Sequence, residues 1–130
     1  MSNRRNHKGR STTERFVRLP YFMLQSSAWL SLSPAARCTW IELAARYNSS
    51  NNGYLALSVR DAAERVGCSK DTAAKALTHL IAKGFIECCS KGHFDRKSPH
   101  ASEYRLTLYS CDRTGGRASK AFMSWREGLS

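Results

Sequence analysis

A short stretch of the sequence near its middle carries side chains that suit hydrogen bonding to nucleic acid. Lysine can donate to guanine O6 and N7, aspartate can accept from cytosine N4, and threonine or alanine can contact a thymine methyl group. Hydroxyl and backbone N–H groups at the start of a helix attract phosphate. The candidate residues are Ser69, Lys70, Asp71, Thr72, Ala74, Lys75 and Thr78. The chemistry that they predict is non-covalent recognition of double-stranded DNA.

The spacing of apolar residues predicts that this stretch is a helix over residues 69–83, capped by Ser69. Ala73, Ala76, Leu77 and Leu80 recur at the helical period and form one buried stripe. The 100° step per residue then directs residues 71, 74, 75, 78 and 82 outward. Because the major groove is only about 12 Å wide, the small outward side chains suit a helix that enters it.

Each of these residues also has a simpler interpretation. Asp71 and Lys75 lie four residues apart, so they could form only a local ion pair, worth about 0.3–0.5 kcal/mol. An alanine-rich surface also favours a helix without any partner. We interpret His79 as a packed or surface residue, with no catalytic role.

A second helix is predicted over residues 59–66, immediately before the first. Ser58 and Asp61 have the spacing of a capping box, and Val59, Ala62, Ala63 and Val66 form an apolar stripe. Gly67 can adopt the left-handed conformation that ends this helix, and Ser69 caps the next one. Two short helices joined by a turn of about three residues match the helix-turn-helix arrangement.

The flanking segments predict the rest of the fold. Ser33 and Pro34 begin a helix over residues 34–48, with Ala36, Trp40, Leu43, Ala44 and Tyr47 on one face. Residues 16–33 form a partly helical lead-in. "YLALS", "FIECCSK" and "EYRLTLYS" have the alternation of short strands. This order predicts a mainly α fold with a small β-hairpin (α+β), a winged helix-turn-helix with a three-helix core and a two- or three-stranded wing.

Basic residues are concentrated at two further places. The predicted wing, residues 91–102, contains Lys91, Arg96, Lys97 and His100. Residues 1–18 hold six arginines or lysines against one glutamate, which is +5 of the net charge of +11. The arm residues that we expect to contact DNA are Arg4, Arg5, Lys8 and Arg10. The alternatives are solvated loop charges in the wing and a solubilising N-terminal tail.

The chain of 130 residues fits one domain with tails. We expect a disordered basic arm over residues 1–15, a winged-helix domain over 16–112 and a tail over 113–130. The tail has a possible short helix capped at Ser119, which would dock on the domain or serve a dimer. No apolar run is long enough for a membrane span or a signal peptide, so we expect a cytoplasmic, nucleoid-associated protein.

Five cysteines without a secretory context predict reduced thiols. Cys88 and Cys89 with His93 and His100 could suggest a metal site. Adjacent residues of a strand point to opposite faces, however, so we expect neither a metal nor a cofactor.

The run "GCSKDTAAKALTHLIAKGFI" resembles the recognition helix of bacterial winged-helix regulators of the GntR and MarR kind. The longer run "YNSSNNGYLALSVRDAAERVGCSKDTAAKAL", with "ASEYRLTLYSCD", is similar to a family of small bacterial helix-turn-helix proteins without an assigned role. The resemblance covers roughly residues 16–126. It implies DNA binding. Fewer than twenty residues follow the predicted wing, so we expect no effector domain of the GntR type.

These observations favour a protein that binds double-stranded DNA sequence-specifically. Among such proteins, we favour a transcriptional regulator. A replication initiator or a recombination accessory protein of a mobile element is an alternative. Another is a protein-interaction adaptor, in which Trp29, Phe122, Met123 and Trp125 face a partner. We expect no enzyme, because no phosphate loop, nucleophile elbow or paired-histidine motif is present. A homodimer is possible, and the sequence indicates no small-molecule effector site.

Overall fold

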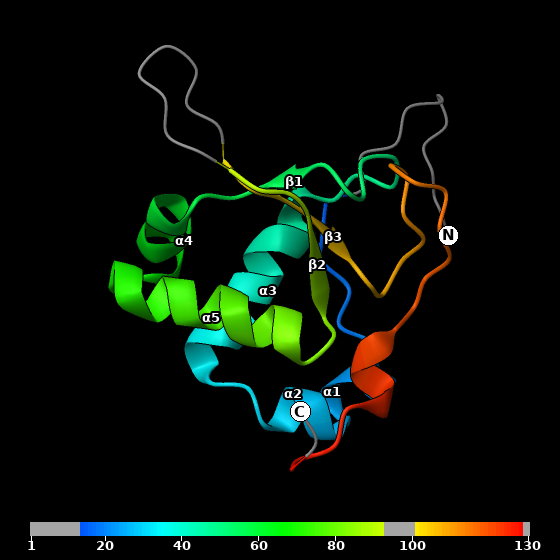
Figure 1. The fold of residues 1–130 in the computed structure, drawn as a ribbon, viewed down its shortest axis with the longest axis horizontal. Coiled ribbons are helices and arrows are strands. Elements are labelled where there is room, and N and C mark those ends of the chain that lie inside the picture. Colours follow the sequence, from blue (N-terminus) through cyan, green and yellow to red (C-terminus); the bar gives the residue numbers. More distant parts are fainter. Residues whose placement is uncertain (1–13, 93–100, 129–130) are drawn as a thin grey trace.

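Three helices form the core of the protein, and a small sheet closes one side of them (Figure 1). The computed structural model describes residues 14–92 and 101–128. Helices α3 (Pro34–Arg46), α4 (Val59–Val66) and α5 (Lys70–Ala82) pack against one another. Strands β1 (Leu55–Ala56), β2 (Ile86–Ser90) and β3 (Glu103–Leu106) form an antiparallel sheet in the order β1-β3-β2. The protein therefore has the predicted α+β winged-helix fold.

Helix α3 begins as predicted and ends two residues early. The Ser33 hydroxyl accepts a hydrogen bond from the Ala36 amide at 3.1 Å, and Pro34 occupies the first helical position. Tyr47, which the helical pattern assigned to the buried face, has an extended backbone and lies beyond the helix. Its ring stacks on Tyr109, with ring centroids 4.4 Å apart. The tertiary contact explains why the apolar pattern continues beyond the last helical residue.

The helix-turn-helix geometry agrees with the sequence pattern. Helix α4 spans the predicted residues, and the Ser58 hydroxyl accepts from the Asp61 amide. Gly67 ends α4 in the left-handed conformation, at φ 85°. Ser69 then caps α5, so the turn between the helices occupies residues 67–69.

The strands are shorter than the sequence indicated. Residues 54–58, 85–91 and 103–110 were predicted as strands, but the strands cover only Leu55–Ala56, Ile86–Ser90 and Glu103–Leu106. Irregular register between Cys88 and Ser90 disturbs the pairing of β2 near the wing. After Leu106, β3 gives way to a turn, because Asn52 binds backbone groups on both sides of it.

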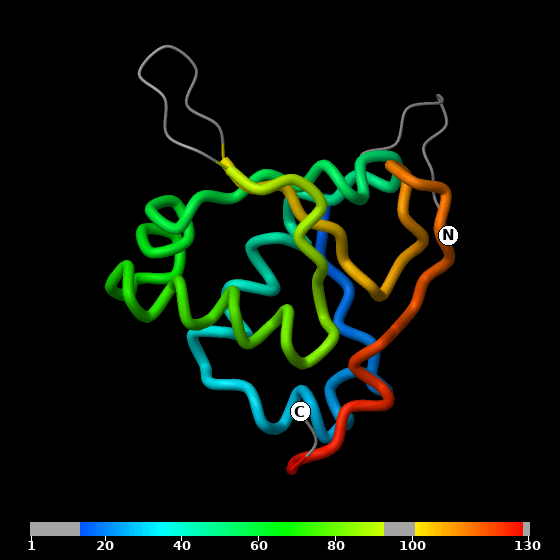
Figure 2. Tube along the Cα trace, viewed as in Figure 1, coloured from blue at the N-terminus to red at the C-terminus, as the bar shows by residue number. Residues whose placement is uncertain are grey.

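The N-terminal and C-terminal segments meet at one end of the molecule (Figure 2). Helices α1 (Tyr21–Leu24) and α2 (Ser27–Leu30) make up the helical lead-in, and the 3₁₀-helix η1 (Ala121–Ser124) packs against α2. Phe122 is buried and stacks on Phe85, with ring centroids 4.8 Å apart. The tail therefore packs on the domain, which is one of the two possibilities that the sequence left open.

Two expectations for these segments were wrong. The residue before η1 is Lys120 in the left-handed conformation, and no side chain caps this helix, so Ser119 is not its cap. Trp29 and Phe122, named as partner-facing in the adaptor alternative, belong to the core.

Candidate nucleic-acid interface

Helix α5 has one buried face and one exposed face. Ala73, Ala76, Leu77 and Leu80 are buried against α3 and α4. All seven candidate residues of this helix and its cap are exposed: Ser69, Lys70, Asp71, Thr72, Ala74, Lys75 and Thr78. The structure thus brings these residues together on a single surface, with small side chains between the two lysines.

The first turn of α5 is organised by its cap. The Ser69 hydroxyl accepts from the Thr72 amide at 3.1 Å and donates to the Thr72 hydroxyl at 3.0 Å. The amides of Lys70 and Asp71 point out of the helix end, where the geometry of a helix provides no acceptor. A phosphate could accept hydrogen bonds from these amides, while the exposed ammonium group of Lys70 adds positive charge.

The proposed local pair between Asp71 and Lys75 is not formed. Within the described part of the chain, the ion pairs are Glu42–Arg46, Glu42–Arg65, Glu87–Arg105 and Glu103–Arg113. The Lys75 ammonium group and the Asp71 carboxylate therefore both face solvent, available to a ligand.

Sequence reasoning missed the ion pair that ties α4 to α3. The Glu42 carboxylate lies 3.1 Å from Nε of Arg65 and 3.3 Å from Nη1 of Arg46. The pairing of Glu42 with Arg46 is visible as a helical i, i+4 spacing. The pairing with Arg65 spans 23 residues and has no sequence signal. This contact helps to set the orientation of the helix that precedes α5.

The described part of the wing contains one of its candidate residues. Lys91 is exposed directly after β2, and the Gly92 amide donates to the Ser102 hydroxyl at 2.8 Å across the base of the hairpin. In Figure 1 this end of the hairpin lies toward the same side as α4 and the first turn of α5. Arg96, Lys97 and His100 lie outside the described residues, as do the arm residues Arg4, Arg5, Lys8 and Arg10.

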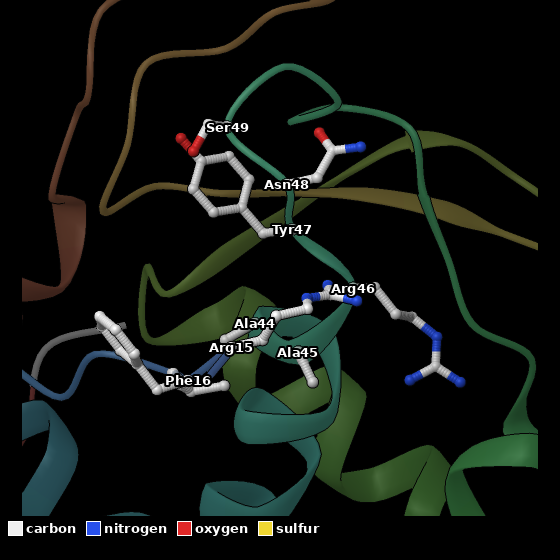
Figure 3. A pocket seen from close by; sticks show the side chains of 9 residues that line it. Arg15, Phe16, Ala44, Ala45, Arg46, Tyr47, Asn48 and Ser49 are labelled. Carbon is white, nitrogen blue, oxygen red and sulfur yellow. The ribbon is translucent and has the colours of Figure 1, made fainter. Parts of the chain in front are cut away.

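The described chain begins beside the C-terminal end of α3. A groove with a volume of about 610 Å³ lies here. Figure 3 shows side chains that line it, with Arg15 and Phe16 on one side and Tyr47 and Ser49 on the other. A cation such as Arg15 is favoured at a helix C-terminus, where backbone carbonyls concentrate negative charge. Arg15 is exposed and lines this groove together with residues at the end of α3.

The part of the chain that contains the three packed helices is similar to a known family of domains. Residues 30–86 match the model of a helix-turn-helix domain family. The match covers α3, β1, α4 and α5, and it supports a DNA-binding helix-turn-helix domain. No curated protein and no solved structure matches the chain.

The matched residues include α5, so the exposed α5 surface lies within the matched region. The likeness to GntR and MarR regulators and a bacterial origin stay predictions. Within the described residues, no helix is both long and apolar enough to cross a membrane.

Proposed function

We propose that the protein binds double-stranded DNA sequence-specifically, with α5 in the major groove. The observation that carries the proposal is the division of α5 into a buried apolar face and an exposed face of small and polar residues. Lys75 at mid-helix would reach base edges, and Thr78 or Ala74 would contact a thymine methyl group. Ser69, Lys70 and Thr72 would hold a phosphate at the first turn.

The wing and the arm would add contacts that depend little on sequence. Lys91, with Arg96, Lys97 and His100 of the wing, would bind phosphates or the minor groove. Arg4, Arg5, Lys8 and Arg10 would bind backbone phosphates flanking the α5 contact. A net charge of +11 supports this electrostatic contribution.

The biological role that we favour is transcriptional regulation, as a homodimer on a palindromic site. Replication initiation and recombination would use the same interface. A genome-wide binding map would distinguish these roles, because it would place the sites at promoters, at one origin or at the ends of a mobile element. A protein that acts only as an adaptor would give no specific sites.

Two lysine variants test how α5 would read DNA. Lys75→Ala should cost about 1–3 kcal/mol on the preferred site and relax the choice of one base pair. Lys70→Ala should weaken binding to every sequence alike, because a phosphate contact carries no base information. Binding profiles on a randomised duplex library measure both effects.

Thermal melts of both variants provide the control. Both side chains are exposed, so both variants should melt near the wild type. If Lys75→Ala leaves the profile unchanged while binding remains specific, α5 is not the reader, and Arg96 and Lys97 of the wing become the leading candidates.

A further inference from the structure

The end of the molecule built by α1, α2 and η1 carries an exposed apolar surface that the proposed DNA contact does not use. We call it the α1–η1 patch, and its residues are Tyr21, Phe22, Leu30, Ile81, Met123 and Trp125. Tyr21 is 80% exposed and Leu30 is 65% exposed. Large apolar side chains gathered on one surface commonly mark an interaction site.

Direct contacts connect the parts of this patch. Phe22 stacks on Phe122, next to Met123, with ring centroids 6.3 Å apart. The Lys83 ammonium group donates to the Ser31 carbonyl at 3.2 Å and lies 4.9 Å from the centre of the Trp125 ring. These contacts join α1, α2, η1 and the end of α5 into one surface, and Figure 1 shows these elements together below the sheet.

A groove opens at one side of the patch, where Ile81 and Trp125 contribute to its lining. It has a volume of about 970 Å³ and runs between the C-terminal end of α5, β2 and η1. Its walls include Ile81, Gly84, Ala121 and Trp125, so much of its lining is apolar. A concave apolar surface favours a segment of polypeptide over a flat partner.

Lysine and arginine side chains surround the patch, and they contact backbone carbonyl groups or aromatic rings. The Lys120 ammonium group lies 5.2 Å from the centre of the Phe22 ring. Arg126 donates to the carbonyls of Met123 and Trp125, and Arg37 donates to the carbonyls of Trp29 and Leu30. Together with Lys83, these residues place four positive charges around the apolar centre.

The segments that build the patch are free of acidic residues in the sequence. Residues 15–41, 72–86 and 113–126 contain no aspartate or glutamate. Glu87, on the β2 wall of the groove, is paired with Arg105, and Glu127 follows Arg126. The surface therefore has a strong excess of positive charge that a ligand could neutralise.

We infer that the α1–η1 patch binds an acidic segment of a partner protein that also carries large apolar side chains. Apolar groups of the segment would cover Tyr21, Leu30 and Met123, while its carboxylates would pair with Lys83, Lys120 and Arg126. A second copy of this chain would bring the same four cations to the interface, so charge opposes it. Duplex DNA offers no apolar surface that could cover the exposed aromatic and aliphatic side chains of the patch.

This inference goes beyond the proposed function and stands independently of it. The patch includes only the C-terminal end of α5, and Lys83 lies eight residues, or about 12 Å, along the helix from Lys75. The partner segment and DNA could therefore be bound at the same time, which would connect a DNA site to another protein.

Selection from a phage-displayed library of random 12-residue peptides on the full chain tests the inference. Enriched peptides should combine Asp or Glu with Phe, Leu or Trp. Their affinity, measured by fluorescence anisotropy, should fall about tenfold or more in the double variant Tyr21→Ser/Leu30→Ser and in Lys120→Glu. The matched controls, Phe16→Ser for the apolar change and Lys75→Glu for the charge, should bind these peptides within about twofold of wild type.

Each other outcome would overturn the inference. These outcomes are the absence of patch-dependent peptides, enrichment of basic peptides, or equal binding to the double variant. If the wild type sediments with phosphatidylserine vesicles and the double variant does not, the patch binds membranes instead. If the wild type is a dimer and the double variant is a monomer, the patch binds a second copy of the chain instead.

DNA binding is measured separately on the same variants. Tyr21→Ser/Leu30→Ser should bind duplex DNA as the wild type does, because neither residue lies on the exposed face of α5. Failure of the peptide selection with normal DNA binding would reject only the partner site, and the reverse result would reject only the proposed function.

Discussion

Asn52 shows how much one buried polar side chain can organise in this protein. It is fully buried, and its side-chain amide donates to the carbonyls of Leu106 and Ser110 at 2.9 and 2.8 Å. Its side-chain oxygen accepts from the Leu106 amide at 2.7 Å, and its own backbone amide donates to the Asp112 carboxylate. One residue thus joins the loop after α3 to the end of β3 and the segment that follows.

Replacement of Asn52 by alanine should therefore destabilise the fold. The change leaves several buried backbone groups without partners, so we expect a loss of about 3 kcal/mol in the free energy of unfolding. Urea denaturation measures the loss. Asn48→Ala, at an exposed position in the same loop, should cost less than about 1 kcal/mol. Equal losses in the two variants would show that burial of the Asn52 network is unimportant.

Two glycines with similar backbone conformations provide a second test at the residue scale. Gly67 has φ 85° and open space around it, whereas a Cβ atom on Gly84, at φ 87°, would lie 2.7 Å from the backbone of Ala121 and Phe122. Gly67→Ala should cost about 1–2 kcal/mol, from left-handed strain alone. Gly84→Ala should cost at least about 1 kcal/mol more, because the docked tail must move. Thermal melts of both variants would reveal the difference, and equal costs would argue that the tail packs loosely.

At the scale of the element, α5 separates stability from recognition on its two faces. Leu77→Ala should reduce the free energy of unfolding by about 2–5 kcal/mol, since Leu77 is buried against the other helices. Thr78→Ala, one position along, should change stability by less than about 0.5 kcal/mol and lower DNA affinity instead. Chemical denaturation measures the stability of both variants, and fluorescence-anisotropy titrations measure their affinity for DNA. Loss of stability in Thr78→Ala would mean that the exposed face contributes to the fold.

The N-terminal arm and the charge of the whole molecule determine the expected salt dependence. If about six phosphates are neutralised, log affinity should fall with log salt concentration at a slope near −5. Deletion of residues 1–15 should lower affinity for all sequences together and reduce the slope, without changing the preferred site. Anisotropy titrations over a range of salt concentrations measure this, and a flat response would contradict electrostatic binding. Loss of site preference on deletion would make the arm a base reader.

The helix-turn-helix could be predicted from sequence because its determinants are local. Caps at Ser33, Ser58 and Ser69, the left-handed Gly67 and the apolar stripes all act within a few residues, so α4 and the turn have the predicted bounds. The exposed face of α5 follows from the same helical period. Its role in reading DNA stays a prediction.

The tertiary structure decided what depends on residues far apart in the chain. Tyr47 leaves its helix to stack on Tyr109, Arg65 crosses to Glu42, and Asn52 ends β3 by binding the segment beyond it. Phe122 enters the core because α1, Phe85 and Gly84 leave room for it, which no local pattern in the tail reveals. Sequence by itself therefore determined α3, α4 and α5 and which face of each helix is apolar. Packing determined the ends of the elements, the docked tail and the α1–η1 patch, because these depend on contacts between segments that only folding brings together.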